Sequence, residues 1–335
     1  MATLSANAFN ALTMADWAKR KDPDGKTAAI VEMLGQSNEV LTDMLFVEAN
    51  KMDSHVTTVR TALPTPEWRL INQGVSPSKS TTAQVEEACA MLEAWSEVDV
   101  ELANLGGDPN SFRLSEASAF VEAMGQEHAS TLVYGNHGTA PEEFTGFAPR
   151  YASLSGTTGQ NIISGSGASS NSSIWLIGWG QNTVHGIFPK GSKAGIEHQN
   201  LGEVTVETTA GIAGKRMRAY QDKFSLKTGL CLKDWRYAVR YANINIANLV
   251  AKSSAADLIE GMIKMIHRIP SLNAAKFAFY MNRTCLQALD IQMRDDVLSG
   301  GQLRYENVDG KPVMSFRGIP VRKCDALLEN EAAVA

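Results

Sequence analysis

The chain lacks the sequence features of several large protein classes. It has only four cysteines in 335 residues, all far apart and none in a C-x-x-C pair. This spacing predicts reduced thiols, without a disulfide framework or a zinc finger. The sequence contains no run of about 18 apolar residues. It also does not open with a basic segment followed by an apolar stretch, so we expect neither a transmembrane helix nor a secretory signal.

Positive charge is also scarce. The chain carries 31 lysines and arginines against 36 aspartates and glutamates, which gives a formal net charge of −5 at pH 7. A protein that grips nucleic acid through its phosphates needs a basic surface, so this charge balance argues against that class. The content of 44% hydrophobic and 20% charged residues is typical of a globular protein with one large or two ordinary domains.

The sequence has no recognisable catalytic, metal or cofactor motif. Its six histidines form neither an H-E-x-x-H pattern nor an i, i+4 pair. The glycine-rich segment 155–173 lacks both phosphate-binding glycine patterns and is predicted to be a flexible surface loop. The carboxylates of Glu97, Asp99 and Glu101 share one face of a predicted strand, which is more typical of a solvated surface than of a catalytic pair. We therefore predict no catalytic residue, no metal ligand and no cofactor.

The segment around residues 55–102 is predicted to form a long β-hairpin with a polar tip. HVTTVRTA at 55–62 alternates like a strand, and a second strand is predicted at residues 98–102. The tip between them contains prolines and small polar residues but few aliphatic ones. Since such a tip cannot build its own core, it either moves freely in solvent or lies on another surface.

Residues 108–136 are predicted to form a long amphipathic helix. Pro109 and the polar residues after it mark its start, and Gly135 marks its end. Glu116, Glu122 and Gln126 are predicted to face water. The apolar positions at helical spacing, which we expect to be buried, are Leu114, Ala117, Phe120, Val121, Met124, His128 and Leu132.

The second half of the chain predicts a mixed α/β region. Strands are expected at 174–180, 183–189, 202–208 and 276–282, with helices at 254–267 and 284–294. Hairpin turns are expected at 227–229 and 309–310. The segment 319–327 is predicted to be a strand at a sheet margin, because proline lacks the N–H that a central strand donates.

Two classes of function remain open at this point. One is an assembly protein, in which the hairpin and strand edges contact other chains. The other is a soluble cytoplasmic α/β enzyme whose site only the fold reveals. The segment LPTPEWRL at 63–70 favours assembly. Pro64 and Pro66 lower the entropy cost of ordering the segment, and Trp68 and Arg69 are typical interface anchors.

The order of these parts resembles the major capsid proteins of tailed double-stranded DNA phages, over essentially the whole chain. The likeness is greatest to the short-tailed branch that includes epsilon fifteen and the Bordetella phage capsids. The stretches that carry the resemblance are TVRTALPTPEWRLINQG, QVEEACAMLEAWSEVD, RLSEASAFVEAMGQE, WRYAVRYANI, FYMNRTCLQAL and FRGIPVRKCDAL.

The resemblance implies an α+β fold of the Hong Kong 97 phage type. Its parts would be an N-terminal arm (1–50), an extended E-loop hairpin with its flanks (51–105), a peripheral domain with a long spine helix (106–147), an axial domain (148–304) and closing strands at the domain junction (305–335). The peripheral domain would be completed by the flanks of the E-loop and by late strands.

The resemblance also implies a structural protein of the virion and no enzyme. Copies would assemble in the host bacterial cytoplasm into hexamers and pentamers of an icosahedral shell around double-stranded DNA, without sequence-specific binding and without a membrane. Further partners would be a portal protein and a possible cement or decoration protein. Some relatives begin with a long cleaved scaffolding segment, and because the arm here begins almost at Met1, scaffolding would be either a separate protein or dispensable. The expected inter-subunit contacts are Pro64, Pro66, Trp68, Arg69, Leu70 and Lys79. Some relatives cross-link a loop lysine to an asparagine, but no motif here identifies a partner for Lys79, so no cross-link is expected.

Overall fold

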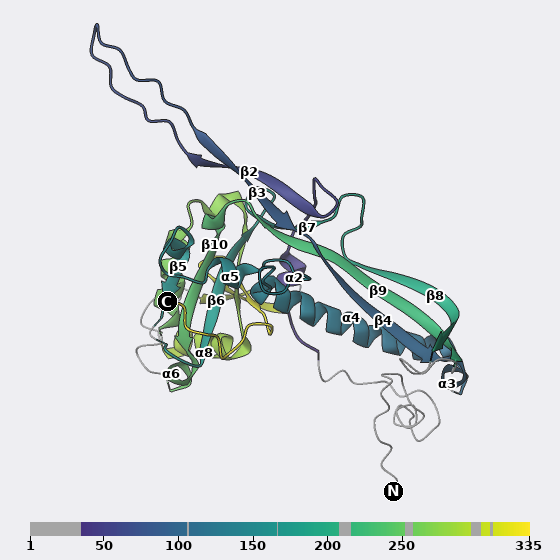
Figure 1. Ribbon diagram of the computed structural model, residues 1–335. Helices are drawn as coiled ribbons and strands as arrows, with labels where there is room; N and C mark the ends of the chain where they lie inside the picture. The colour runs from purple at the N-terminus through teal and green to yellow at the C-terminus, as the bar shows by residue number, and fades with distance from the viewer. Residues whose placement is uncertain are drawn as a thin grey trace. The chain divides into compact units, whose positions relative to one another are not determined.

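The computed structural model describes residues 35–105, 107–165, 167–207, 216–251, 257–295, 303–308 and 311–335 (Figure 1). Most of the predicted N-terminal arm and the predicted turn at 309–310 lie outside these residues. The chain forms two compact units. Among the described residues, one comprises 35–36, 91–128 and 195–227, and the other comprises 37–90, 129–194 and 228–335.

The first unit combines a long helix with long strands. Strands β8 and β9 pair antiparallel from Ile196↔Leu226 to Glu207↔Arg216, and β4 lies beside β9 in the sheet. One small core contains Met124, Phe224 and Leu226, against which Phe120 packs. The elements are α3 (Val100–Asn104), α4 (Pro109–Tyr134), β4 (Ala90–Asp99), β8 (Ile196–Glu207) and β9 (Arg216–Leu232), and the last residues of α4 and β9 belong to the second unit.

The predicted long helix is confirmed as α4, but its buried face was only partly predicted. Leu114 and Val121 are exposed, whereas Phe112, Met124 and His128 are buried. Leu132 is buried as well, and Phe120 is partly buried. Leu114 and Val121, seven residues apart, share one face of the helix and are exposed at 73% and 42%. Hydrophobicity alone could not show which apolar positions of the helix are covered by other elements.

The predicted strand at 98–102 is wrong beyond Asp99. The strand β4 ends there, and the Asp99 carboxylate accepts a hydrogen bond from the Glu101 N–H at 2.9 Å. This bond caps α3, because a side-chain oxygen at the N-cap satisfies an amide that the first helical turn leaves free. Glu97, Asp99 and Glu101 therefore do not share a strand face. The Glu97 side chain instead accepts a bond from Gln221 at 2.8 Å.

The second unit is built on a mixed sheet whose central strand is β6 (Asn171–Trp179). Every residue of β6 is buried, and the strand lies between β10 (Ala238–Asn245) and β11 (Lys276–Met281), both antiparallel to it. The predicted flexible loop at 155–173 is therefore wrong in part. Its residues 162–164 form β5, parallel to β10, and its last three residues begin β6. Buried isoleucines at 162 and 163 outweigh the surrounding glycines and serines.

The remaining elements of the second unit agree largely with the prediction. The expected helices are present, although α7 begins after Asp257, whose side chain accepts a bond from the Glu260 N–H, and the predicted start at Ser254 is outside the described residues. The helices are α2 (Val40–Asp43), α5 (Phe147–Arg150), α6 (Ile246–Val250), α7 (Leu258–Arg268) and α8 (Arg283–Asp295), with 3-10 helices at Thr158–Asn161, Trp235–Tyr237 and Leu272–Ala274. The strands are β1 (Phe46–Glu48), β5 (Ile162–Ser164), β7 (Val184–Phe188), β12 (Leu303–Val308), β13 (Lys311–Phe316) and β14 (Ile319–Lys323). No helix in the described part of the chain has the length and apolar character needed to cross a membrane.

The proline-bearing strand β14 does not lie at a sheet margin as predicted. It pairs antiparallel with β13 and parallel with β11, so it has a neighbour on each side. The two-residue turn before it has positive φ at both Arg317 and Gly318 (51° and 81°), which is the geometry of a tight hairpin. The ladder with β11 begins at Val321, one residue after Pro320, so the missing N–H falls before the pairing starts.

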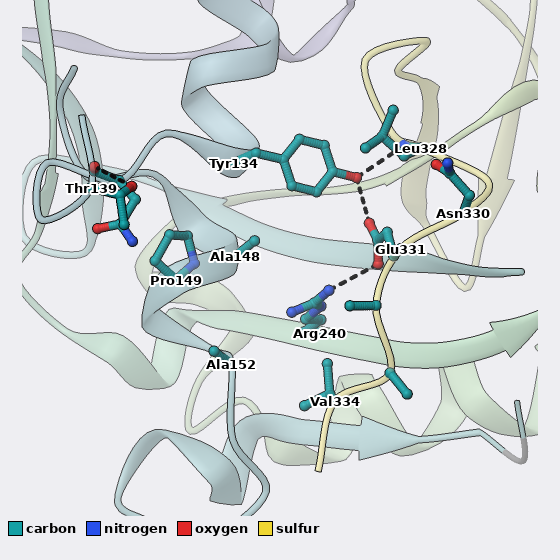
Figure 2. A pocket seen from close by; sticks show the side chains of 13 residues that line it. Tyr134, Thr139, Ala148, Pro149, Ala152, Arg240, Leu328, Asn330, Glu331 and Val334 are labelled. Carbon is teal, nitrogen blue, oxygen red and sulfur yellow. Dashed lines mark hydrogen bonds and ion pairs between the residues drawn. The ribbon is translucent and has the colours of Figure 1, made fainter. Parts of the chain in front are cut away.

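A buried ion pair ties the C-terminal segment to the second unit (Figure 2). The Arg240 guanidinium lies 2.9 Å from the Glu331 carboxylate, and both side chains are about 95% buried. Glu331 also accepts hydrogen bonds from the hydroxyls of Tyr134 and Ser173, and Arg240 donates to the Tyr151 carbonyl at 2.9 Å. Beside the pair lies a hollow of about 470 Å³ that is lined by backbone and small side chains of the last residues.

The core position of Phe120 predicts a measurable loss of stability. Phe120 stacks on Phe224 with ring centroids 6.0 Å apart, but its side chain is only partly buried. We expect Phe120→Ala to lower the free energy of unfolding by about 2 kcal/mol, below the 3–5 kcal/mol of a fully buried aromatic. Leu114→Ala, at an exposed position of the same helix, should change it by less than about 0.5 kcal/mol. Urea denaturation of the unassembled subunit measures both, and equal losses would contradict the face assignment.

The buried ion pair predicts a larger effect. Glu331→Gln leaves the Arg240 charge buried without its counter-charge, which should cost about 3–5 kcal/mol of unfolding free energy. Glu329→Gln is the matched control, because Glu329 is exposed and only two residues away. Denaturation followed by tryptophan fluorescence compares them. Parental stability of Glu331→Gln would show that the pair contributes little.

Candidate assembly surface

The hairpin predicted near residues 51–105 is present, but its paired strands cover a shorter stretch of the chain than predicted. Strand β2 (Ser54–Ala62) pairs with β3 (Thr81–Ala88), not with residues 98–102. Residues 63–80 belong to no strand, and Figure 1 shows them continuing beyond β2 and β3 as a long, narrow loop. We call these residues the hairpin tip.

The hairpin tip exposes an unusual amount of apolar surface. Every residue from 61 to 79 is exposed, and Trp68 is exposed as fully as in an extended chain, at 104%. Leu63, Leu70, Ile71 and Val75 are exposed as well. Contiguous apolar surface of this kind marks an interaction site, because a soluble chain otherwise covers it.

The hairpin tip holds its shape through its own polar contacts. The Arg69 guanidinium donates to the Gln73 carbonyl at 2.7 Å, and the Gln73 N–H donates to the Leu70 carbonyl at 3.1 Å. Asn72 takes a positive φ of 69°, which asparagine tolerates better than most residues. Farther down, the Ser78 hydroxyl donates to the Thr65 carbonyl at 2.9 Å. These bonds restrict the conformations that the tip can adopt.

The structure brings all the contact residues predicted from the sequence into this one tip. Trp68 and Leu70 present apolar side chains to solvent, and Arg69, although bonded to Gln73, keeps further N–H donors. The Lys79 side chain is also exposed. The predicted contact set lies in one continuous segment, comprising Pro64, Pro66, Trp68, Arg69, Leu70 and Lys79.

The base of the hairpin is fixed to the sheet of the second unit. Arg150 forms a two-point ion pair with Glu87 of β3, at 2.5 and 2.6 Å, and both side chains are largely buried. A Cβ at Gly229 of β9 would lie 2.7 Å from the Ala88 carbonyl oxygen, so only glycine allows this approach. The predicted turn at 227–229 is therefore wrong, because Gly229 lies within β9 and serves close packing.

Three side chains at the base of the hairpin form a cluster that the sequence analysis missed. His55 of β2, His185 of β7 and Cys231 of β9 place their nitrogen and sulfur atoms within 4.8 Å of one another. They are 130 and 46 positions apart in the sequence, so no local motif indicates them. Only the register of β7 with β9, which pairs His185 with Cys231, brings them together.

The hollow beside Arg240 is a poor candidate for an active site. Its charged and phenolic groups, Arg240, Glu331 and Tyr134, bond to one another. Burial, followed by the Glu331 charge, raises the pKa of the Tyr134 hydroxyl well above its usual range, so this group neither gives nor takes a proton near neutrality. The hollow supports a structural role for these residues.

Comparison with known proteins agrees with the features described above. The family model of major capsid protein GP7 matches residues 22–335. A solved structure of bacteriophage Epsilon15 is 30% identical, covers 99% of each chain and has a TM-score of 0.80. The bacteriophage JBD30 capsid is 11% identical over 94% of this chain and 99% of its own, with a TM-score of 0.47. No curated protein matches.

The family model and the Epsilon15 structure decide the assignment, since each extends over nearly the whole chain. They confirm the predicted α+β capsid fold of the Hong Kong 97 phage type and the prediction of a structural, non-enzymatic virion component. The chain therefore belongs to the major capsid protein GP7 family and is a shell-forming protein of a bacteriophage head.

Proposed function

We propose that copies of this chain form hexamers and pentamers of an icosahedral shell, in which the hairpin tip of each copy lies on a neighbouring copy. The observation that carries this proposal is the ordered, fully exposed apolar tip around Trp68. A tip without a core of its own gains stability only from a surface outside the chain.

The energetics favour a contact of this kind. An aromatic side chain can bury about 150–250 Å², and apolar burial contributes about 25 cal/mol per Å². Trp68 with Leu70 could thus supply several kcal/mol per contact before the costs of association are subtracted. The internal bonds of the tip and its two prolines reduce those costs, because they restrict the conformations of the loop before it binds.

The two units suggest the roles of the chain's parts. We assign the unit with most of α4 to the peripheral domain, with α4 as its spine helix, and the sheet around β6 to the axial domain that lies near each capsomer centre. In this assignment residues 51–105 supply the E-loop and its flanks, residues 148–304 supply most of the axial domain except for 195–227, which lie in the first unit, and residues 305–335 supply the closing strands. The boundaries follow those implied by the sequence resemblance.

The charge balance supports a shell that encloses DNA without gripping it. Phosphate binding grows with the number of cations presented, and the net charge of −5 offers no general excess. We infer assembly in the host bacterial cytoplasm, with a portal protein, a separate scaffolding protein and a cement protein as further partners.

The hairpin tip should be dispensable for folding and required for assembly. We predict that replacing Pro64–Lys79 with a short Gly-Ser turn leaves the melting temperature of the unassembled subunit close to the parental value, because the tip contacts no core. The same variant should form no closed shells. Circular dichroism melts and electron microscopy of particles measure the two properties.

Point variants separate lost apolar contact from lost loop shape. Trp68→Ser should raise the protein concentration needed for assembly at least tenfold, which corresponds to about 1.4 kcal/mol per contact. Ser76→Ala, in the same tip, removes no apolar surface and should assemble like the parent. Normal shells from the shortened chain would disprove the role of the tip, and a collapsed melt would show that the tip belongs to the subunit's own core.

A further inference from the structure

We propose that His55, His185 and Cys231 form a binding site for one divalent transition-metal ion of the zinc class at the base of the hairpin. The three residues come from three strands of the second unit, β2, β7 and β9. His185 and Cys231 are direct partners in the β7–β9 ladder, and the His55 ring meets the His185 ring edge-on with centroids 6.0 Å apart.

The distances fit a metal site after a small closure. Around a tetrahedral zinc ion, nitrogen and sulfur ligands are about 3.3–3.6 Å apart. The donor atoms of the cluster already lie within 4.8 Å of one another. Side-chain rotations that move each donor atom by about 1 Å would therefore bring the three atoms to these distances. Three protein ligands leave a fourth position for water or another ligand.

An unsatisfied buried side chain points independently to a ligand. His185 is completely buried, and neither ring nitrogen makes a close, well-directed hydrogen bond within the described part of the chain. The Gly180 backbone is the one hydrogen-bonding group there that acts on the ring, and it can serve only one of the two nitrogens. Buried polar atoms nearly always have partners, and an unseen ion is one recognised explanation for an exception. The nitrogens of His185 lie in a cluster with two other good metal donors, which makes this explanation specific.

The protonation states suit metal binding at neutral pH. Burial, with smaller effects of Lys233 and His55, lowers the pKa of His185 to about 4, and burial also lowers the pKa of His55. Both imidazoles are therefore neutral, and each has one nitrogen with a lone pair. In His55 the Asn50 N–H donates to Nδ1 at 3.3 Å, so metal binding through this ring must replace that bond or use the other tautomer. Burial raises the pKa of the Cys231 thiol, so binding must release one proton from this sulfur as the metal–sulfur bond forms. The Thr57 hydroxyl, 3.6 Å from the sulfur, is placed to donate to the resulting thiolate.

The donor set selects the class of metal. Two imidazoles and a thiolate suit zinc and its neighbours in the first transition row, whereas calcium and magnesium prefer oxygen ligands. The nearby charges of Lys233 and Arg150 disfavour a cation. The thiolate and the Glu87 carboxylate oppose them, although Glu87 is already paired with Arg150. A bound ion would connect β2 of the hairpin to β7 and β9 of the sheet.

Cobalt provides a direct test, because a Co²⁺–thiolate bond absorbs light and tetrahedral Co²⁺ has intense visible bands. We expect the reduced, untagged full-length chain to bind one Co²⁺ with a thiolate charge-transfer band, to release about one proton per ion, and to lose the band when Zn²⁺ is added. His185→Gln and Cys231→Ser should weaken binding more than about 100-fold, beyond the 10–100-fold effect of losing an outer partner of a metal ligand. Cys89→Ser and His137→Gln should bind like the parent.

A third variant protects the test against misfolding. His55→Gln changes a half-exposed residue, should retain the parental circular dichroism spectrum, and should also lose the thiolate band. Zn²⁺ should raise the melting temperature of the parent, and a chelator should reverse the rise, with neither effect in His55→Gln. Absence of the thiolate band from the parent would overturn the proposal, as would parental binding by folded His55→Gln.

Discussion

The ion pair between Arg150 and Glu87 fixes the base of the hairpin, and the contact that we propose for the hairpin tip depends on this anchor. A hairpin can hold its tip at one position only if its base does not rotate. Two short, largely buried contacts between a guanidinium and a carboxylate define one orientation, because both groups are planar. The close approach of Ala88 to Gly229 adds a steric restriction that does not depend on charge. In the exposed tip, polar groups form the internal hydrogen bonds, and apolar side chains such as Trp68 face solvent.

The sequence predicted most elements of the fold where one physical signal was dominant. β6 and β11 could be predicted because short apolar runs are typical of buried strands. α4 could be predicted from its length and its end signals. The wrong predictions concern residues whose role in the fold does not follow from the local sequence pattern. Gly229 looks like a turn but allows backbone contact, and Asp99 looks like a strand residue but caps a helix. Pro320 looks like an edge residue, but it pairs with Ser315 of β13 and precedes only the ladder with β11.

The candidate surface could be predicted better than the histidine–cysteine cluster for a similar reason. The contact residues from Pro64 to Lys79 lie in one segment, so their composition identifies them before any fold is known. His55, His185 and Cys231 become neighbours only through strand register. A single shift of one residue in β7 would turn His185 to the other face of the sheet, and nothing in the local sequence reports that register.

The position of β14 has a consequence for the timing of folding. The sheet of the second unit receives β14 between β13 and β11, and Glu331 neutralises Arg240 from β10. Since a chain emerges from the ribosome from its N-terminus, residues 319–331 leave after every other strand of that sheet has been made. The hairpin tip at residues 63–80 emerges long before. A nascent chain thus exposes the apolar hairpin tip while the sheet that carries the hairpin still lacks β14, and this sheet is complete only after residues 319–323 have emerged.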